Sequence, residues 1–200
     1  MSNKASSTNH KYLIIGLHAS GKHEIAEDLI KNGIKVGKNF VSLPNFSSDI
    51  YLLNTVYYQS QDIDTMFESQ AYIFMQKKLA GGESYYEGLS LYEYDNNSVF
   101  VMSPDQFDLI PSISSDVTIV WLDNNVSDRR LRYLSERRKY DFTKEENYER
   151  QDMAEFIDKI NSSPNKVLYF NNEDPLRVSA IIYALVKNPE LLKVFEERFN

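Results

Sequence analysis

The sequence predicts an α/β fold in which helices flank a parallel sheet, and two observations predict it. First, four short and largely apolar runs are typical of strands that are buried on both faces. They cover Tyr12–Gly16, Ser98–Met102, Val117–Leu122 and Lys166–Phe170. Second, each run is followed within a few residues by a stretch with helical spacing. Because such alternation places crossover helices on a sheet, the sheet is expected to be parallel.

The first helix is expected over Lys22–Asn32, where Ile25 and Leu29 share one face and Gly33 stands at the C-cap position. The helices expected after the other strands cover residues 105–110, 126–139 and 175–187. Two further helical patterns cover roughly residues 62–79 and 144–160. A last helix over 188–200 is expected to pack on the core or on a second subunit, which leaves a homodimer open.

Residues 1–10 are polar and are expected to form a flexible tail, followed by a single domain over residues 11–200. The interval from about residue 34 to residue 95 is long for a connection in a compact domain. It mixes short β-like pieces (35–36, 40–43 and 54–58) with one helix and a turn-rich segment over 80–88. This interval is therefore predicted to be an inserted subdomain that moves.

The composition of the 200 residues argues against several classes of protein. The net charge is −7, from 22 Lys and Arg against 29 Asp and Glu, whereas nucleic-acid binding needs cations that neutralise phosphates. The chain has no cysteine, so no disulfide, thiolate zinc site or thiol nucleophile is expected. The polar first residues do not resemble a signal peptide, and the longest aliphatic stretches are far shorter than the ~20 residues of a membrane span. We therefore expect no membrane partner and a cytoplasmic location.

The segment Gly16–His23 matches the phosphate-loop pattern G-x-x-x-x-G-K-S/T at every position except the last. The four residues between the glycines, which include Ser20, let successive backbone N–H groups point into one anion-binding concavity. Gly21 then opens a helix whose positive end faces the same anion, and Lys22 adds a charge for the β- and γ-phosphates. The alternative interpretation is an ordinary strand–helix turn with an exposed lysine. The position between a buried strand and an amphipathic helix favours phosphate binding.

His23 occupies the position at which a Ser or Thr hydroxyl would contact Mg²⁺, and imidazole nitrogen is a poor match for this hard cation. Either the metal is held by other oxygen atoms and by the nucleotide, or metal binding and turnover are impaired. The sequence leaves both open. His10 lies in the tail and His18 in the loop, so no metal ligation by protein nitrogen or sulfur is expected.

Six of the eight arginines lie between residues 129 and 150 of this acidic chain. Guanidinium groups bind phosphate through two N–H groups and stabilise the charge of a transferring phosphoryl group. The block follows a predicted strand and spans two predicted helices, so it is expected to form a lid over about residues 125–150 that closes on a nucleotide. The alternative is a solvated helix surface on which neighbouring glutamates pair with these arginines. The six are Arg129, Arg130, Arg132, Arg137, Arg138 and Arg150.

In the order of these features the chain resembles guanylate kinase, a member of the P-loop nucleoside monophosphate kinases. Tyr85–Ser90 is similar to the Tyr-Tyr-Gly-Thr/Ser element of that family, and Ser103–Gln106 is similar to its aspartate-bearing strand end. The run Val126–Arg132, continued by Arg137 and Arg150, is similar to the lid. The stretch over 169–174 is similar to the Val-Asn-Asp stretch near the adenine pocket. The resemblance implies a P-loop kinase fold with an inserted acceptor-binding subdomain and an arginine-rich lid.

The resemblance also implies a reaction: the γ-phosphoryl group of ATP is transferred to a nucleoside monophosphate, with ATP and Mg²⁺ as cofactors and a small-molecule nucleotide as partner. The site residues that it implies are Lys22 for the donor phosphates, Arg132, Arg137 and Arg150 for the transferring group, Tyr86, Ser90 and Asp105 with Tyr57 or Tyr58 for the acceptor, and Asn171 beside the adenine. Gly16, Ser20, Gly21 and His23 complete the phosphate loop. The chain has 14 tyrosines, and most of them are expected simply to pack.

The chain departs from the family's pattern in the acceptor segment. Residues 35–45 contain no arginine where the family has Thr-Thr-Arg-x-Pro-Arg, and Lys35 or Lys38 is only a partial substitute. The family's guanine-reading glutamate would fall near residues 71–74, which hold no acid, and Glu68 would need a shifted alignment. These departures leave two alternatives: a catalytically degenerate domain that binds a nucleotide or a protein partner, and a kinase of another small acceptor.

Overall fold

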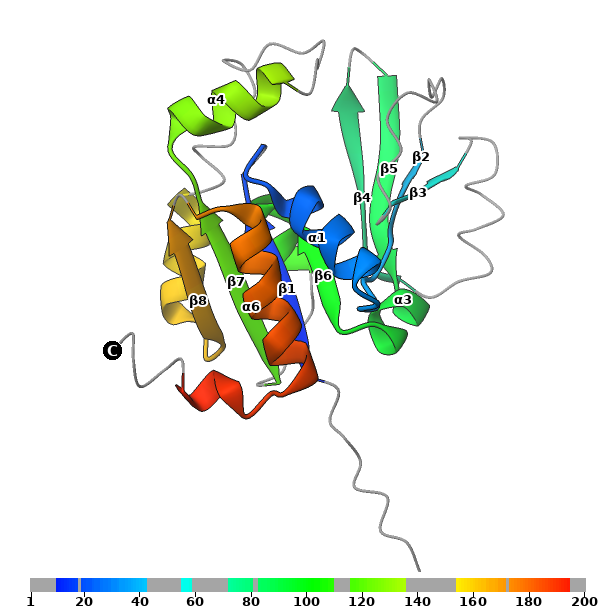
Figure 1. The fold of residues 1–200 in the computed structure, drawn as a ribbon. Helices are drawn as coiled ribbons and strands as arrows, with labels where there is room; N and C mark the ends of the chain where they lie inside the picture. Colours follow the sequence, from blue (N-terminus) through cyan, green and yellow to red (C-terminus); the bar gives the residue numbers. More distant parts are fainter. Residues whose placement is uncertain are drawn as a thin grey trace, which may run out of the picture.

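The computed structural model describes residues 10–17, 19–42, 55–58, 72–80, 83–109, 116–135, 154–171 and 173–194. Four parallel strands form the main sheet (Figure 1). In spatial order they are β6 (Val99–Met102), β1 (Lys11–Gly16), β7 (Val117–Asp123) and β8 (Lys166–Asn171). The bounds agree within one residue with the four predicted apolar runs, so the predicted parallel sheet is confirmed.

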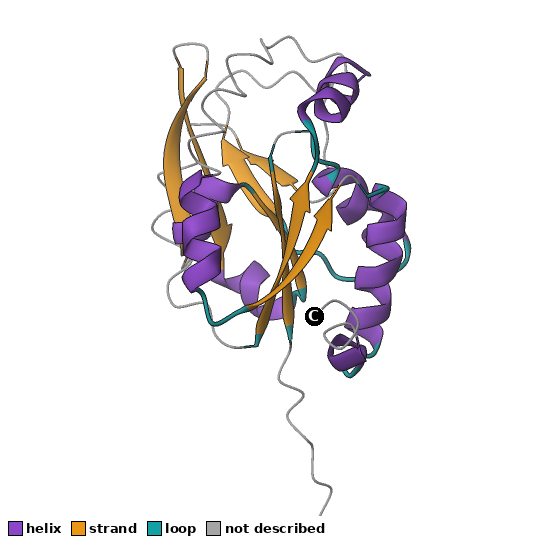
Figure 2. Ribbon diagram, turned by 90° about the vertical axis from the view of Figure 1, so that its left-hand side faces the viewer, coloured by secondary structure: helices purple, strands orange, loops and turns teal. Residues whose placement is uncertain are grey.

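Helices cover both faces of the main sheet (Figure 2). On one face lie α1 (Lys22–Lys31) and α6 (Pro175–Lys187), and on the other lies a helix over residues 154–162. The Ser179 hydroxyl of α6 donates to a carboxylate oxygen of Asp28 on α1 at 2.6 Å. The helices predicted over 22–32 and 175–187 are confirmed, and the described part of the one predicted over 144–160 is helical.

Each face of the main sheet has its own apolar cluster, because successive strand side chains point to opposite sides. Tyr12 and Ile14 of β1 pack with residues of α1 and α6, whereas Leu13 and Ile15 pack with Phe156 of the helix over 154–162. All four of these β1 side chains are at most 1% exposed. Burial on both faces explains why this strand is apolar without alternation.

A second sheet of four strands lies within the interval from residue 34 to residue 95 (Figure 1). In spatial order its strands are β3 (Thr55–Tyr58), β2 (Asn39–Ser42), β5 (Glu83–Ser90) and β4 (Tyr72–Ala80). β4 and β5 form an antiparallel hairpin. Phe74 and Leu89 of this hairpin are buried in the same cluster as Leu13 and Ile15, so the second sheet is anchored on the core.

The second sheet corrects two predictions. The helix predicted over residues 62–79 is wrong from residue 72 onward, because β4 is extended and pairs with β5 along its length. The segment over 80–88, which was expected to be rich in turns, belongs mostly to β5. In both cases hydrogen bonds to a neighbouring strand outweigh the local pattern. The β-like pieces expected at 40–43 and 54–58 are confirmed as β2 and β3.

Three shorter elements complete this part of the fold. The helix predicted over 105–110 is a 3-10 helix, η2 (Pro104–Leu109), and α4 (Val126–Ser135) covers the start of the helix predicted over 126–139. α3 (Leu91–Asn96) was not predicted. Residues 1–9 of the predicted tail, residues 59–71 and most of the predicted lid (136–153) lie outside the described residues. The tail prediction is wrong at its last residue, because His10 is half-buried, packs edge-on against Tyr12 and has its Nε2 2.8 Å from the Thr118 hydroxyl. None of the helices that the structure describes is long and apolar enough to cross a membrane.

Candidate functional site

The ends of three neighbouring strands define the candidate site. β1 runs between β6 and β7, with Ile15 beside Met102 and Gly16 beside Leu122. The loop after β1 (residues 16–21), the segment after β6 that leads into η2, and the end of β7 therefore lie at the same edge of the sheet. In open α/β sheets, ligands bind at this carboxyl edge.

The loop after β1 has a backbone shape that suits an anion. Ala19 and Gly21 have positive φ values of 55° and 91°, with Ser20 between them. Such positive φ values on either side of one residue are typical of an anion-binding nest, in which successive N–H groups point to one side. The Ser20 N–H donates within the loop, to the Leu17 carbonyl oxygen at 3.3 Å. Gly16 leaves no room for a side chain, since a Cβ there would lie 2.9 Å from the Leu122 carbonyl oxygen.

The nest leads directly into the N-terminus of α1. Gly21 is the N-cap residue, no side chain caps the helix there, and the Ile25 N–H donates to the Gly21 carbonyl oxygen at 3.0 Å. The N-terminus of a helix carries a partial positive charge, which favours an anion at this position. The loop and the N-terminus of α1 thus both favour an anion at the same position. His18, in the middle of the loop, lies outside the described residues.

Lys22 lies over the loop. The residue is only 8% exposed, and Nζ donates to the carbonyl oxygens of Gly16 at 2.5 Å and Leu17 at 2.6 Å. Ser20 Oγ lies 3.4 Å from the same nitrogen. The alternative interpretation expected an exposed lysine, and the burial of Lys22 contradicts that part of it. Phosphate binding by the loop stays a prediction. Oxygen atoms of the loop hold the ammonium group beside the nest.

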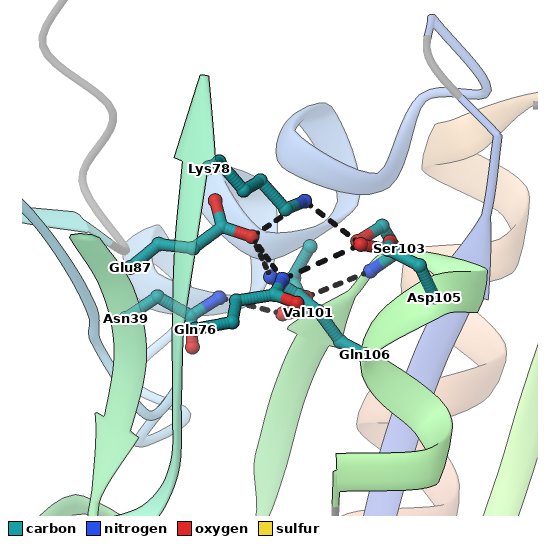
Figure 3. Close-up of polar contacts among 8 residues, drawn as sticks. All are labelled: Asn39, Gln76, Lys78, Glu87, Val101, Ser103, Asp105 and Gln106. Atoms are coloured by element: carbon teal, nitrogen blue, oxygen red, sulfur yellow. Dashed lines mark hydrogen bonds and ion pairs between the residues drawn. The ribbon is translucent and has the colours of Figure 1, made fainter. Parts of the chain in front are cut away.

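A second polar group lies between the second sheet and η2 (Figure 3). We call it the Lys78 cluster, and it consists of Gln76, Lys78, Glu87, Asp105 and Gln106. Lys78 Nζ lies 2.6 Å from Glu87 Oε1 and 2.9 Å from Asp105 Oδ2. Gln76 Nε2 donates to the same two oxygens, at 2.5 Å and 3.3 Å, and Gln106 Nε2 donates to Glu87 Oε1 at 2.7 Å. The cluster ties the β4–β5 hairpin to the segment that follows β6.

The charges of the Lys78 cluster stabilise one another. Burial by itself lowers the pKa of Lys78, but the carboxylates of Glu87 and Asp105 outweigh burial and raise this pKa above its usual value. Burial by itself raises the pKa of Asp105, but the Lys78 ammonium and several hydrogen bonds outweigh it and hold this pKa below its usual value. Lys78 and Asp105 are therefore both charged at neutral pH.

The residues predicted to bind the acceptor have different surroundings. Asp105 belongs to the Lys78 cluster. Ser90 is buried, and its hydroxyl caps α3 by accepting from the Glu93 N–H at 3.2 Å. Tyr86 lies on β5, with Lys77 Nζ 5.9 Å from its ring centroid. Tyr57 and Tyr58 belong to β3, but their side chains lie outside the described part.

The predicted lid and adenine-side residues are described only in part. Arg132 belongs to α4, whereas its side chain, Arg137 and Arg150 lie outside the described part of the chain, so their role stays a prediction. Arg129, on the same helix, is only 2% exposed. Asn171 is exposed at the end of β8, and its role beside the adenine also stays a prediction.

Most of the Lys78 cluster was not predicted from the sequence. Gln76, Lys78 and Gln106 were not among the predicted site residues, and Glu87 appeared only as part of a tyrosine-containing element. A signal was present, because Gln76 and Lys78 are two residues apart and therefore share one face of a strand. Recognising β4 as a strand would have paired them. Nothing local in the sequence places that strand beside Asp105.

The described residues at this edge do not fit a Mg²⁺ site, which the resemblance implies. The cation prefers oxygen ligands, whereas His23 offers nitrogen at the second position of α1. Asp105 and Glu87 pair with Lys78, and Asp123 Oδ2 accepts a hydrogen bond from the Tyr169 hydroxyl at 2.6 Å. Among the residues that the structure describes, no three His, Cys, Asp or Glu side chains are grouped so that they could hold a metal ion.

Comparison with known proteins shows a similarity of fold but no match in sequence. No protein-family model matches the chain, and no curated protein matches its sequence. The structure is similar to the crystal structure of guanylate kinase from Anaplasma phagocytophilum, with a TM-score of 0.53 and 12% sequence identity. The similarity covers 88% of this chain and 84% of that chain. The chain therefore has a mixed α/β fold that is distantly related in structure to a guanylate kinase.

Proposed function

We propose that the chain binds ATP at the loop of residues 16–22 and transfers the γ-phosphoryl group to a nucleoside monophosphate. One observation carries the proposal: a nest with positive φ at Ala19 and Gly21 leads into the N-terminus of α1, and the Lys22 ammonium lies over it. The structural similarity to a guanylate kinase supports the same class of reaction.

In this proposal, phosphate oxygens replace the loop carbonyl oxygens as the partners of Lys22. The ammonium has two carbonyl oxygen partners at 2.5 and 2.6 Å, and these two hydrogen bonds would be exchanged for bonds to the phosphate. Phosphoryl transfer depends mainly on positioning and on stabilisation of the developing charge. Arg132, Arg137 and Arg150 are proposed to supply that charge from the lid over residues 125–150.

The acceptor is proposed to bind between the second sheet and η2. Asp105 on η2 borders this region, whereas Tyr86 of β5 lies with Lys77 on the face of the sheet opposite Lys78. Tyr58 and Ser90 belong to the same sheet. Because Asp105 Oδ2 is engaged by Lys78, an acceptor would contact the Lys78 cluster as a unit and not a single carboxylate. Asn171, at the end of β8, is proposed to lie on the adenine side.

A second candidate function is nucleotide binding without catalysis, and a specific observation favours it. Two described carboxylates at the proposed acceptor region, Glu87 and Asp105, are both paired with Lys78. An acceptor would have to compete with an ammonium group at 2.6 to 2.9 Å for these oxygens. A domain that had ceased to catalyse would keep the phosphate loop and lose the open acceptor site.

An assay of ADP release separates the two candidates. The protein is incubated with ATP, Mg²⁺ and each common ribonucleoside or deoxyribonucleoside monophosphate in turn. We expect ADP release with one acceptor or one acceptor class. Thermal stabilisation by ATP without ADP release would support the non-catalytic binder, because a ligand at ~100 times its Kd adds ~2.7 kcal/mol to the free energy of unfolding. If neither ADP release nor thermal stabilisation by ATP were observed, both candidates would be contradicted.

Arg137→Ala tests the proposed lid. An arginine that contacts only the transferring group stabilises the transition state, so we expect kcat to fall by roughly 100-fold or more while ATP affinity changes little. Arg177→Ala is the matched control, because Arg177 is exposed on α6 and pairs with Glu173 at 2.9 Å on the same surface. Equal losses of kcat and ATP affinity would assign Arg137 to donor binding instead.

A further inference from the structure

We propose that this site binds the phosphates of its nucleotide without a divalent cation held by the protein, because the chain's own cationic and N–H or O–H donors engage the oxygen ligands that such a cation would need. The inference rests on the proposed phosphate binding at residues 16–22. It goes beyond that function by stating which charged form of the nucleotide the site prefers. Three groups of oxygen atoms at the carboxyl edge of the sheet carry the argument.

The first group lies in the loop itself. Lys22 Nζ lies within 2.6 Å of two backbone carbonyl oxygens and 3.4 Å from Ser20 Oγ. The next residue, His23, presents a nitrogen ligand where a hydroxyl would suit a hard cation. The hydroxyl that the loop does contain, Ser20 Oγ, is therefore beside an ammonium group, and a divalent cation at this oxygen would be repelled.

The second group is the carboxylate pair of the Lys78 cluster. Glu87 and Asp105 come from different elements, and one oxygen of each converges on the same Lys78 nitrogen, at 2.6 Å and 2.9 Å. A divalent cation bound at this place would also be contacted by two carboxylates. Here the chain supplies the positive charge itself. Two amide donors, from Gln76 and Gln106, take further positions on the same oxygens.

The third group is the carboxylate at the end of β7. Asp123 Oδ2 accepts from the Tyr169 hydroxyl at 2.6 Å, and this bond raises the pKa of Tyr169 to about 12, with burial adding to the shift. The Tyr169 hydroxyl therefore stays protonated at neutral pH and donates to Asp123. Asp105 after β6, Glu87 of β5 and Asp123 at the end of β7 are therefore each engaged by protein donors.

A site of this kind has a definite preference among nucleotide species. An ammonium group with no metal ligand beside it attracts metal-free ATP more strongly than magnesium-bound ATP, because the cation neutralises part of the phosphate charge. Magnesium should therefore leave ATP binding unchanged or weaken it. A site with a protein ligand for the cation behaves in the opposite way, since the metal bridges protein and phosphate.

Isothermal titration calorimetry of the full chain tests this preference without any variant. ATP is titrated once in excess EDTA and once in excess Mg²⁺, at equal ionic strength. We expect a Kd in EDTA that is equal to or lower than the Kd in Mg²⁺. Binding that is tighter in Mg²⁺ by more than about threefold would overturn the inference. Absence of ATP binding in both buffers would instead overturn the proposed function on which the inference rests.

A second measurement uses Mn²⁺ alone as the probe, followed by the electron paramagnetic resonance signal of the free ion. Wild-type protein is expected to take up no Mn²⁺ at micromolar concentration, and Lys78→Met is expected to take it up, because its two converging carboxylates lose their cation. Lys78→Arg keeps the positive charge and is the matched control that should bind none. The inference would be overturned if the wild type took up Mn²⁺ and Asp105→Asn abolished this uptake. It would also be overturned if Lys78→Met were folded and took up no more Mn²⁺ than the wild type.

Discussion

Lys22→Ala is expected to weaken ATP binding by roughly 10- to 100-fold, because hydrogen bonds to a charged group contribute about 1.5–3 kcal/mol. Any ADP release should fall by at least about 100-fold, since the same ammonium group would also stabilise charge that develops on the transferring group. The structural reason is the position of Nζ, which already lies over the nest and has two oxygen partners there. Calorimetry with ATP measures the first effect, and a coupled assay of ADP measures the second.

Two variants make the Lys22 experiment specific. Lys31→Ala removes a lysine from the last turn of the same helix, where its side chain is 67% exposed and lies 3.8 Å from Glu27. It should change neither ATP affinity nor stability measurably, because exposed ion pairs contribute at most about 1 kcal/mol. Lys22→Arg keeps the charge but has a larger head group, so it should recover only part of the affinity. Undiminished ATP affinity in Lys22→Ala would show that the loop of residues 16–22 is not the phosphate site.

Lys78→Met is expected to lower the free energy of unfolding by about 3 kcal/mol near neutral pH, the lower end of the range for breaking a buried ion pair. The side chains of Lys78 and Asp105 are each 29% exposed and that of Glu87 is 14% exposed, so solvent screens the pair only in part. The variant leaves two carboxylates that converge on a missing cation. Urea unfolding of both proteins measures the difference.

The loss in Lys78→Met should shrink as the pH falls below about 4. In the wild type, the pKa of Asp105 is lower in the folded than in the unfolded chain, so its pairing stabilises the fold above the unfolded pKa. This contribution is lost as the pH falls through the folded pKa. In the variant, Asp105 lacks the ammonium group that lowers its pKa, so acid removes less stability from the variant than from the wild type. The raised pKa of Lys78 affects stability only at alkaline pH.

Lys77→Met is the matched control for this experiment. Lys77 is the neighbour of Lys78 on β4, so its side chain points to the opposite face of the strand, where it is exposed. Its substitution should change the free energy of unfolding by no more than about 0.5 kcal/mol at either pH. If Lys78→Met proved as stable as the wild type, the contacts of the Lys78 cluster would make no net contribution to stability.

The main sheet and the loop could be predicted because their signals are local. Residues 12–15 of β1 form an unbroken apolar run because both faces of the strand are buried, and Gly16, Gly21 and Lys22 lie within one short segment. The backbone geometry at Ala19 and Gly21 follows from the same segment. These parts of the fold leave their pattern in consecutive residues.

The hairpin and the Lys78 cluster could not be predicted from local signals. Residues 72–79 have helical spacing, and only their pairing with β5 makes them a strand. The cluster then joins residues 76 and 78 to residue 87 and to residues 105 and 106, which meet only after both sheets have formed. Because the residues of β4 have helical spacing, neither the second sheet nor the Lys78 cluster, which depends on that sheet, could be predicted.

The position of Phe74 and Leu89 in the apolar cluster beneath β1 restricts how the second sheet can move. Both side chains are at most 4% exposed, and they lie near the end of the hairpin at which β4 begins and β5 ends. A swing of the whole sheet would expose this cluster to water, at a cost of several kcal/mol. If the second sheet closes over the proposed nucleotide, we therefore expect the far end of the hairpin to bend while the end that holds Phe74 and Leu89 stays in place.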